Sequence, residues 1–308
     1  MRATPTPTGV LLGRLQPGTS EWEAARTGPV ITATRIAAVM GLSPWESRLS
    51  LYHRLRGEAP DTFTATSEME WGNRHEPTVA EKWQEDHPNH MVLTTGTWRH
   101  RDRPWQRCTP DRLITPLVLD EKWTVADTEV LEIKTSPVAE GWGEDGDPLG
   151  IPVYYRCQVM WQLDTLGLTR ATVAVLIAGH DYRTYPIKYD ADEADLLRTK
   201  ARLFLDDVED GYRPDIDGHS ATYQTIRHLP DGMRDVDVEI EAELRDRYFA
   251  AIDAHAAAET ELTECRSRIL DRIGDGRRAR TAGRLVATRT VRDGHTHSLQ
   301  PARDRSTA

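Results

Sequence analysis

The sequence predicts an α/β fold in which a mixed β-sheet is flanked by helices, followed by a C-terminal extension of one long helix and a β-hairpin. Segments with apolar residues at helical spacing come before and after a group of short strand-like runs. The order helix, several strands, helix, strand is typical of a mixed sheet covered by helices. From about residue 237 to residue 273 the chain is Ala- and charge-rich with a helical pattern, and a basic, weakly alternating stretch follows.

The expected elements follow one another along the chain. One helix begins near Thr32 or Thr34 and ends near Gly41, and a second has Leu51 and Leu55 at helical spacing. The remaining expected elements are helices over 68–86, 151–167 and 190–211, strands over 91–98, 111–119, 129–136, 171–179 and 182–190, and a loop over 139–150.

The helix expected over 68–86 has Trp71, Val79 and Trp83 on one face, which we expect to be buried. Pro77 lies inside this pattern and is expected to interrupt or restart the helix, because proline lacks the amide that a helix interior needs. Over the whole chain we expect a flexible N-terminal lead (1–20), a core (21–235), a helix and basic hairpin (236–300) and a disordered tail (301–308).

The composition restricts the class of protein. The formal net charge of −10 predicts weak long-range attraction to nucleic acid, so any DNA binding requires a local basic groove or bound cations. By itself this charge favours a small-molecule enzyme. Three widely spaced cysteines, Cys108, Cys157 and Cys265, argue against a disulfide framework or a four-cysteine metal site and fit a reducing cytoplasm.

The stretch VLEIKTS, residues 130–136, has the pattern of a half-buried strand but carries two charges. Side chains two apart point to the same side of a strand, so Glu132 and Lys134 share one face. A solvated strand face is the alternative interpretation. Asp111 begins the preceding expected strand, and two such carboxylates with the Ile133 carbonyl provide the oxygen ligands that Mg²⁺ prefers. A turn-capping role is the alternative for Asp111.

Two further side chains are candidates for the same site. Glu76 lies in the expected helix beside residues predicted to be buried, so its carboxylate could approach the same metal. The alternative interpretation is an exposed carboxylate on the helix surface. Gln158 lies on the helix over 151–167 with Tyr154, Tyr155 and Gln162 at helical spacing. Its amide could orient a water or a phosphate near a metal, and polar surface is its alternative.

Taken in order, these segments resemble a known family. Trp22 and Arg26, then ITAT (31–34), WGNRHE (71–76), CTPD (108–111), LEIK (131–134) and YRCQVMWQLDTLG (155–167), resemble the phage lambda-type alkaline exonucleases, or YqaJ-like viral recombinases. This family belongs to the PD-(D/E)XK nuclease superfamily. The resemblance covers roughly residues 20–215 and implies a restriction-endonuclease-like core.

The resemblance also implies roles for individual residues. Glu76, Asp111 and Glu132, with the Ile133 carbonyl, would bind Mg²⁺ or Mn²⁺, Lys134 would lie beside the nucleophilic water, and Gln158 would assist. Arg26 would hold a terminal 5′-phosphate, and Tyr155 would contact DNA. Thr34 and Thr109 stand where the family often has serine hydroxyls that touch the phosphate.

The implied activity is 5′→3′ digestion of double-stranded DNA ends, which leaves a 3′ single strand for recombination. The implied partners are a single-strand annealing protein and two further copies of the chain in a ring trimer. The implied location is the cytoplasm of a bacterial host, with the protein encoded by a phage or prophage. The alternatives are another PD-(D/E)XK nuclease (a RecB-like exonuclease or an endonuclease), a non-catalytic DNA-binding protein on that fold, and a small-molecule metalloenzyme. The basic C-terminal stretch could grip DNA phosphates through Arg277, Arg278, Arg280, Arg284 and Arg289. The alternative is a solvated helix hairpin that serves subunit contacts.

Overall fold

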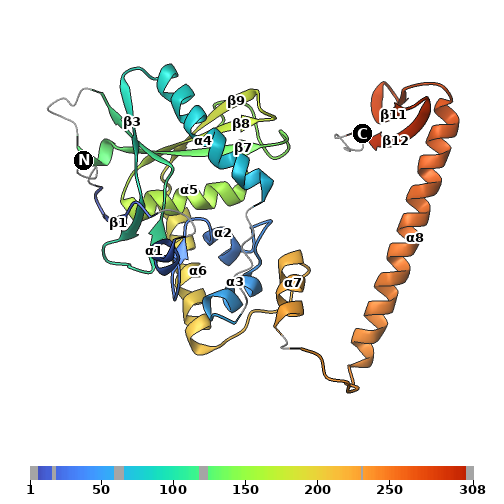
Figure 1. Ribbon diagram of the computed structural model, residues 1–308, viewed down its shortest axis with the longest axis horizontal. Coiled ribbons are helices and arrows are strands. Elements are labelled where there is room, and N and C mark those ends of the chain that lie inside the picture. Colours follow the sequence, from blue (N-terminus) through green and yellow to red (C-terminus); the bar gives the residue numbers. More distant parts are fainter. Residues whose placement is uncertain (1–5, 16–18, 59–65, 118–123, 230–231, 303–308) are drawn as a thin grey trace. The chain divides into compact units, whose positions relative to one another are not determined.

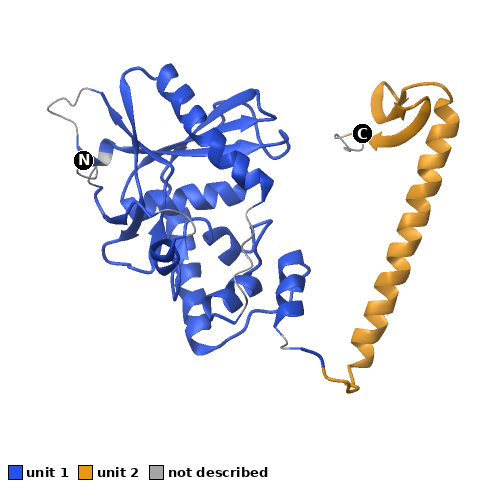
Figure 2. Ribbon diagram, in the orientation of Figure 1, with its two compact units in different colours: residues 1–233 blue, residues 234–308 orange. Residues whose placement is uncertain are grey.

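The computed structural model describes residues 6–15, 19–58, 66–117, 124–229 and 232–302 (Figure 1). The chain divides into two compact units, residues 1–233 and residues 234–308 (Figure 2). The sequence predicted a boundary between residues 235 and 236. Each unit is described by itself.

A mixed sheet of five strands forms the centre of the first unit within the described residues, in the order β3-β6-β7-β8-β9. Its central strand β7 pairs antiparallel with β6 and parallel with β8, and the other pairs are antiparallel. The helix α5 connects the two parallel strands. The prediction of a mixed sheet flanked by helices is therefore confirmed. The strands are β3 (His90–Thr94), β6 (Arg112–Pro116), β7 (Glu129–Ser136), β8 (Arg170–Ile177) and β9 (Asp181–Lys188).

A second sheet has the order β1-β4-β5-β2. It corrects two expectations, because Gly9–Gly13 is the strand β1 rather than part of a flexible lead, and the run expected over 91–98 divides between β3 and β4 in different sheets. Gly96 permits this division, since a Cβ atom there would lie 2.2 Å from the Gly13 carbonyl oxygen. The strands are β1 (Gly9–Gly13), β2 (Ile31–Thr32), β4 (Thr97–His100) and β5 (Gln106–Cys108).

Helices cover both faces of the five-stranded sheet (Figure 1). On one face, Val79, Ala80 and Trp83 of α4 pack against Leu131 and Ile133 of β7. On the other, α5 and α6 contribute to the larger core cluster. The helices of this unit are α1 (Ser20–Ala24), α2 (Ile36–Val39), α3 (Arg48–Leu55), α4 (Ser67–Asp86), α5 (Val153–Leu166), α6 (Ala191–Asp210), α7 (Ser220–His228) and the 3-10 turn η1 (Val125–Asp127).

The helix α4 differs from its prediction in two respects. Pro77 lies inside a continuous helix of 20 residues. Trp71 is 57% exposed, whereas Val79 and Trp83 are buried as expected. The first two turns of α4 therefore extend beyond the apolar contact with the sheet, and the Trp71 ring stacks on His75 at 5.6 Å instead.

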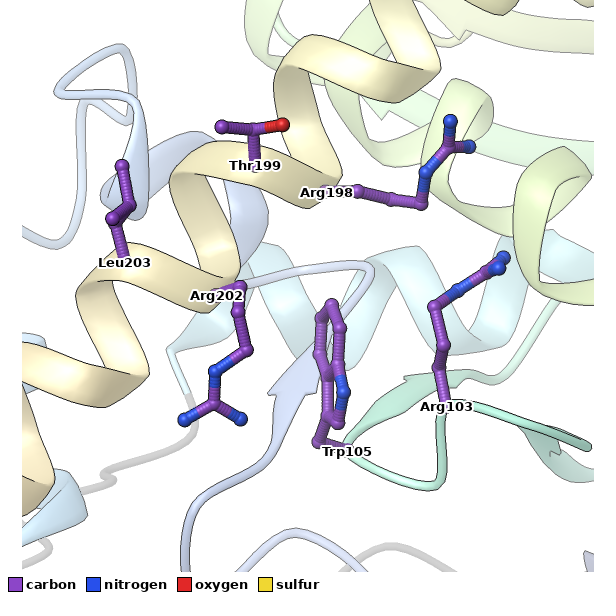
Figure 3. Close-up of a pocket in the computed structure, with 6 residues that line it drawn as sticks. All are labelled: Arg103, Trp105, Arg198, Thr199, Arg202 and Leu203. Atoms are coloured by element: carbon purple, nitrogen blue, oxygen red, sulfur yellow. The ribbon is translucent and has the colours of Figure 1, made fainter.

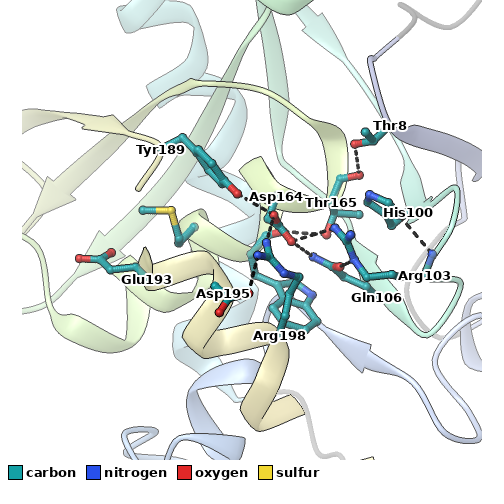
Figure 4. Close-up of polar contacts among 12 residues, drawn as sticks. Thr8, His100, Arg103, Gln106, Asp164, Thr165, Tyr189, Glu193, Asp195 and Arg198 are labelled. Carbon is teal, nitrogen blue, oxygen red and sulfur yellow. Dashed lines mark hydrogen bonds and ion pairs between the residues drawn. The ribbon is translucent and has the colours of Figure 1, made fainter. Parts of the chain in front are cut away.

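A buried carboxylate at the C-terminal end of α5 joins several elements of this unit (Figure 4). Asp164 accepts hydrogen bonds from Gln106 (2.8 Å), Tyr189 (2.9 Å), Arg103 (3.1 Å) and Arg198 (2.5 Å). Two guanidinium groups compensate its buried charge, so this network fixes α5 against β5 and α6.

The second unit contains α8 (Ala242–Ile273) and a three-stranded antiparallel sheet. The long helix is confirmed, and no residue of α8, all of which the structure describes, is buried. The predicted hairpin has a third strand: the sheet consists of β10 (Arg278–Thr281), β11 (Arg284–Arg292) and β12 (His295–Pro301). The expected disordered tail falls mainly on residues 303–308, which lie outside the described residues. No helix in the described part of the chain is long and apolar enough to cross a membrane.

Candidate active site

The two charges of β7 face α5. Leu131 and Ile133 belong to the core cluster on the α4 side of the sheet, whereas Val130 belongs to the cluster on the α5 side. Because side chains alternate along a strand, Glu132 and Lys134 point to the same side as Val130. The Lys134 Nζ donates to the Glu132 Oε1 at 2.6 Å.

The Glu132 side chain is almost completely buried and is hydrogen-bonded by three neighbouring side chains. Its side chain is 2% exposed, so protein groups rather than water must satisfy the carboxylate. Lys134 and Gln158 donate to its Oε1, and Gln162 donates to its Oε2 at 2.8 Å. Since α5 places Gln158 and Gln162 one turn apart, both amides reach the same acid.

Asp111 completes the pairing of β7 where β6 begins. The pairing of β6 with β7 extends only to Arg112 and Leu131. Beyond that register, the Asp111 Oδ2 accepts the backbone N–H of Ile133 at 2.7 Å. The Asp111 carboxylate thus accepts the hydrogen bond that a backbone carbonyl of β6 would otherwise accept. It therefore lies against β7, the strand that carries Glu132.

The electrostatics of the site follow from this crowding. Burial, and then the neighbouring charge of Glu132, raise the pKa of the Asp111 carboxyl well above its ordinary value. Burial opposes the charge of Lys134, but the carboxylates of Glu132 and Asp111 outweigh it and raise the Lys134 pKa. Lys134 is therefore an ammonium ion at neutral pH and can act as a hydrogen-bond donor and a positive charge, but not as a general base.

Glu76 lies near these residues, but its carboxylate is paired with the guanidinium of Arg112. Arg112 Nη1 contacts the Glu76 Oε1 at 2.5 Å and the Asp111 carbonyl at 2.7 Å. Accordingly, no three His, Cys, Asp or Glu side chains of the described ranges already converge as ligands of one metal.

The donor set nevertheless fits a divalent cation. Lys134 is paired with Glu132 and Arg112 with Glu76, whereas the charge of Asp111 is opposed by both neighbouring acids. A cation beside Asp111 would compensate this charge with the carboxylate oxygens that Mg²⁺ and Mn²⁺ prefer. Glu76 would have to leave Arg112 in order to join them.

Two of the residues predicted to hold a phosphate, Arg26 and Thr34, contact each other. Arg26 stacks over the Trp22 ring at 4.3 Å, and its guanidinium donates to the Thr34 hydroxyl at 3.3 Å. Burial and the positive charge of Arg35 lower the Arg26 pKa to about 10. An anion bound here would stabilise the charged guanidinium, so the cluster is suited to a phosphate.

The sheet register relates Thr34 to Thr109. The parallel strands β2 and β5 pair Ile31 with Gln106 and Thr32 with Arg107, which places Thr34 and Thr109 beyond the same end of the pair. The Thr109 hydroxyl is hydrogen-bonded to the Thr97 hydroxyl at 3.0 Å. Tyr155 belongs to the carboxylate site, since its ring lies 4.8 Å from the Lys134 Nζ.

Some residues of the site were not among the predicted site residues. Gln162 was noted only as a neighbour of Gln158, and its contact with Glu132 has a sequence signal in the four-residue spacing of the two glutamines. Trp142 and Trp45 pack around Tyr155, with ring centroids at 5.6 and 6.0 Å. Both tryptophans come from loops, where no periodicity points to their partner.

A separate cavity of about 390 Å³ lies between α6 and the connection from β4 to β5 (Figure 3). None of the predicted site residues lines it. Its arginines are already paired with acids, because Arg103 pairs with Asp164, Arg198 with Asp164 and Asp195, and Arg202 with Asp206. The lining residues are Arg103, Trp105, Arg198, Thr199, Arg202 and Leu203.

Residues 21–170 match the family described as the YqaJ-like viral recombinase domain. Among solved structures, the chain is similar to the alkaline exonuclease LHK-Exo of Laribacter hongkongensis, with 21% identity, a TM-score of 0.47 and coverage of 63% of this chain and 94% of that one. A phage-related exonuclease of Haemophilus somnus 129PT has 11% identity and a TM-score of 0.40, covering 59% and 96%. No curated protein matches the chain. The similarity to this family therefore rests on the match over residues 21–170.

Proposed function

Because residues 21–170 match the YqaJ-like viral recombinase domain, we propose that this chain is a Mg²⁺-dependent exonuclease that degrades double-stranded DNA ends in the 5′→3′ direction. The family supports a nuclease that acts on DNA, as the sequence motifs predicted. The observation that carries the proposal is the buried group formed by Asp111, Glu132 and Lys134, in which a lysine lies among two acids, one on β7 and one directly before β6.

The proposed cation ligands are Asp111, Glu132, the Ile133 carbonyl and, after release from Arg112, Glu76. When bound, a divalent cation would supply Lewis-acid stabilisation of the phosphodiester undergoing attack. Lys134, kept protonated by the two acids, would attract the attacking water and the negative charge that develops on the phosphate oxygens. Gln158 and Gln162 would hold Glu132 in place, and this orientation is their contribution to the site.

Recognition of a strand end is assigned to the Arg26 cluster. A 5′-phosphate would accept hydrogen bonds from the Arg26 guanidinium and the Thr34 hydroxyl, which already contact each other. Thr109 and Tyr155 are proposed as further DNA contacts. Digestion from such an end would leave a 3′ single strand, which an annealing protein would use in phage-type recombination, and the ring trimer of the family is the proposed assembly.

The experiment that tests this function combines purified protein and Mg²⁺ with linear duplexes labelled at either end and with a covalently closed circle. We expect release of nucleotides from the 5′-labelled end and no loss of the closed circle. Cleavage of the circle would identify an endonuclease instead, and binding without cleavage of any substrate would identify a DNA-binding protein.

Lys134→Ala tests the assigned chemistry. Loss of one transition-state contact of this kind typically costs roughly 10²-fold or more in rate, and we expect a decrease of that order. Lys82→Ala is the matched control, because Lys82 forms an exposed pair with Asp86 on the surface of α4 and should leave the rate unchanged. Near-normal cleavage by a folded Lys134→Ala protein would contradict the mechanism.

A further inference from the structure

An aromatic side chain is presented to solvent beside the proposed active site. Trp45 is 64% exposed, although tryptophan is among the largest apolar side chains. Its ring makes an edge-to-face contact with Tyr154, with centroids at 5.0 Å and an interplanar angle of 77°. The contact supports one part of the indole and leaves most of it open.

The turn that carries Trp45 is held in place. The Ser43 hydroxyl accepts the backbone N–H groups of Trp45 at 3.2 Å and Glu46 at 3.1 Å. The Ser43 carbonyl is hydrogen-bonded to the His219 Nε2 at 3.1 Å, which ties the turn to the residue that caps α7. An indole on such a turn loses little conformational freedom when it binds a ligand.

Continuous side-chain contacts lead from Trp45 to the proposed catalytic charges. Trp45 and Tyr154 both contact the Tyr155 ring, which lies 4.8 Å from the Lys134 Nζ. Lys134 in turn contacts Glu132 at 2.6 Å. On its other side, Tyr155 packs against the buried Trp142 at 5.6 Å. One side chain, that of Tyr155, therefore links the exposed indole to the Lys134–Glu132 pair.

We propose that Trp45 is a stacking platform for a nucleobase of the strand being cleaved; this inference depends on the nuclease function proposed above. Every nucleobase has an aromatic face, so a platform of this kind binds DNA without sequence preference. Stacking also does not depend on net charge. It would compensate for the weak long-range attraction to DNA of a chain with a net charge of −10.

Binding to DNA is the first test, with fluorescence anisotropy of the full chain and a labelled, 5′-phosphorylated linear duplex in EDTA, so that nothing is cleaved. Loss of one base–aromatic contact predicts roughly 5- to 150-fold weaker binding by Trp45→Ala. Trp45→Phe should retain most of the affinity. Tyr212→Ala removes a ring of similar exposure, 68%, that makes none of these contacts, and should bind like the natural chain.

Salt dependence separates stacking from a loss of charge contacts. A stacking residue releases no counterions, so the slope of log affinity against log salt should be the same for Trp45→Ala and the natural chain. A shallower slope would mean that the substitution had displaced basic residues instead. It would overturn the assigned role.

Abasic substrates give the second test, with cleavage in Mg²⁺ as the readout. One abasic residue among the first nucleotides of the cleaved strand should raise the KM of the natural chain about as much as Trp45→Ala does, with a smaller effect on kcat. The same abasic nucleotide should have little further effect on the KM of Trp45→Ala, because the stacking contact is already lost. The proposal would be overturned if the abasic residue, at every position tested, raised the KM of Trp45→Ala by the same factor as it raises that of the natural chain.

The outcomes distinguish this inference from the proposed function. If the natural chain cleaves DNA and Trp45→Ala matches it in both binding and KM, the platform is wrong and the nuclease assignment stands. If the natural chain binds DNA through Trp45 but does not cleave it, the nuclease assignment is wrong and the stacking contact stands.

Discussion

The hydrogen bond between Gln162 and Glu132 should contribute measurably to the stability of the first unit. Gln162 is completely buried and donates to the Glu132 Oε2 at 2.8 Å, while Glu132 itself is 1% exposed. Water cannot replace either partner at this depth. A hydrogen bond to a charged group contributes about 1.5–3 kcal/mol to the free energy of unfolding.

A single substitution cannot measure this contribution. The Gln162 Oε1 is buried without a hydrogen-bond partner, so Gln162→Leu removes one unfavourable group together with the favourable contact. A double-mutant cycle of Gln162→Leu and Glu132→Leu cancels this effect, because the change at Oε1 occurs in both backgrounds. The expected coupling energy is about 1.5–3 kcal/mol, with the double variant more stable than the sum of the single changes predicts.

Urea unfolding followed by tryptophan fluorescence is a suitable assay. All nine tryptophans lie before residue 234, so the signal reports on the first unit. A second cycle of Gln162→Leu with Thr222→Val serves as the control, since Thr222 is hydrogen-bonded to Ser47 and Asp217, not to this site. A coupling below about 0.5 kcal/mol between Gln162 and Glu132, equal to that of the control pair, would refute the reasoning.

Three other predictions concern Asp111, Arg26 and the cysteines. The raised pKa of Asp111 means that its contribution to stability in EDTA is fully present below its unfolded-state pKa and is lost as pH rises through its folded-state pKa. Asp111→Asn should therefore gain stability relative to the natural chain as pH rises through that window, and a pH-independent difference in unfolding free energy would count against the shift. Arg26→Ala should reduce the preference for 5′-phosphorylated over 5′-hydroxyl ends by about 10-fold or more, as the loss of a charged hydrogen bond predicts, and an unchanged ratio of initial rates would remove Arg26 from this role. Cys265 is exposed whereas Cys108 and Cys157 are buried, so mass spectrometry after brief maleimide treatment should find label on Cys265 alone, and label on either of the others in folded protein would contradict the fold.

Local sequence patterns predicted much of the carboxylate site. Alternation in VLEIKTS put Glu132 and Lys134 on one face, and the four-residue spacing of Gln158 and Gln162 put both amides on one side of a helix. Both results depend only on the period of a single element. Periods of this kind can be read without knowing what the element packs against.

Contacts between distant elements could not be predicted in the same way. The pairing of Gly9–Gly13 with β4 depends on an approach that Gly96 permits, and the lead contains no signal for it. Arg112 holds Glu76 through a contact between α4 and β6, which helical spacing cannot reveal. Helical spacing put Trp71 on the buried face of α4, but the packing of the assembled layers leaves it exposed.

Asp111 has a structural role beside the catalytic role proposed for it, because one oxygen of its carboxylate completes the pairing of a central strand. The two duties restrict how the position can change over evolutionary time. A descendant without the proposed nuclease activity would not need a negative charge there, yet its sheet would still need an acceptor for the Ile133 amide. Asparagine can accept this hydrogen bond and alanine cannot. Asparagine at this position in inactive descendants would therefore indicate that the strand pairing was still required, and alanine would indicate that it was not.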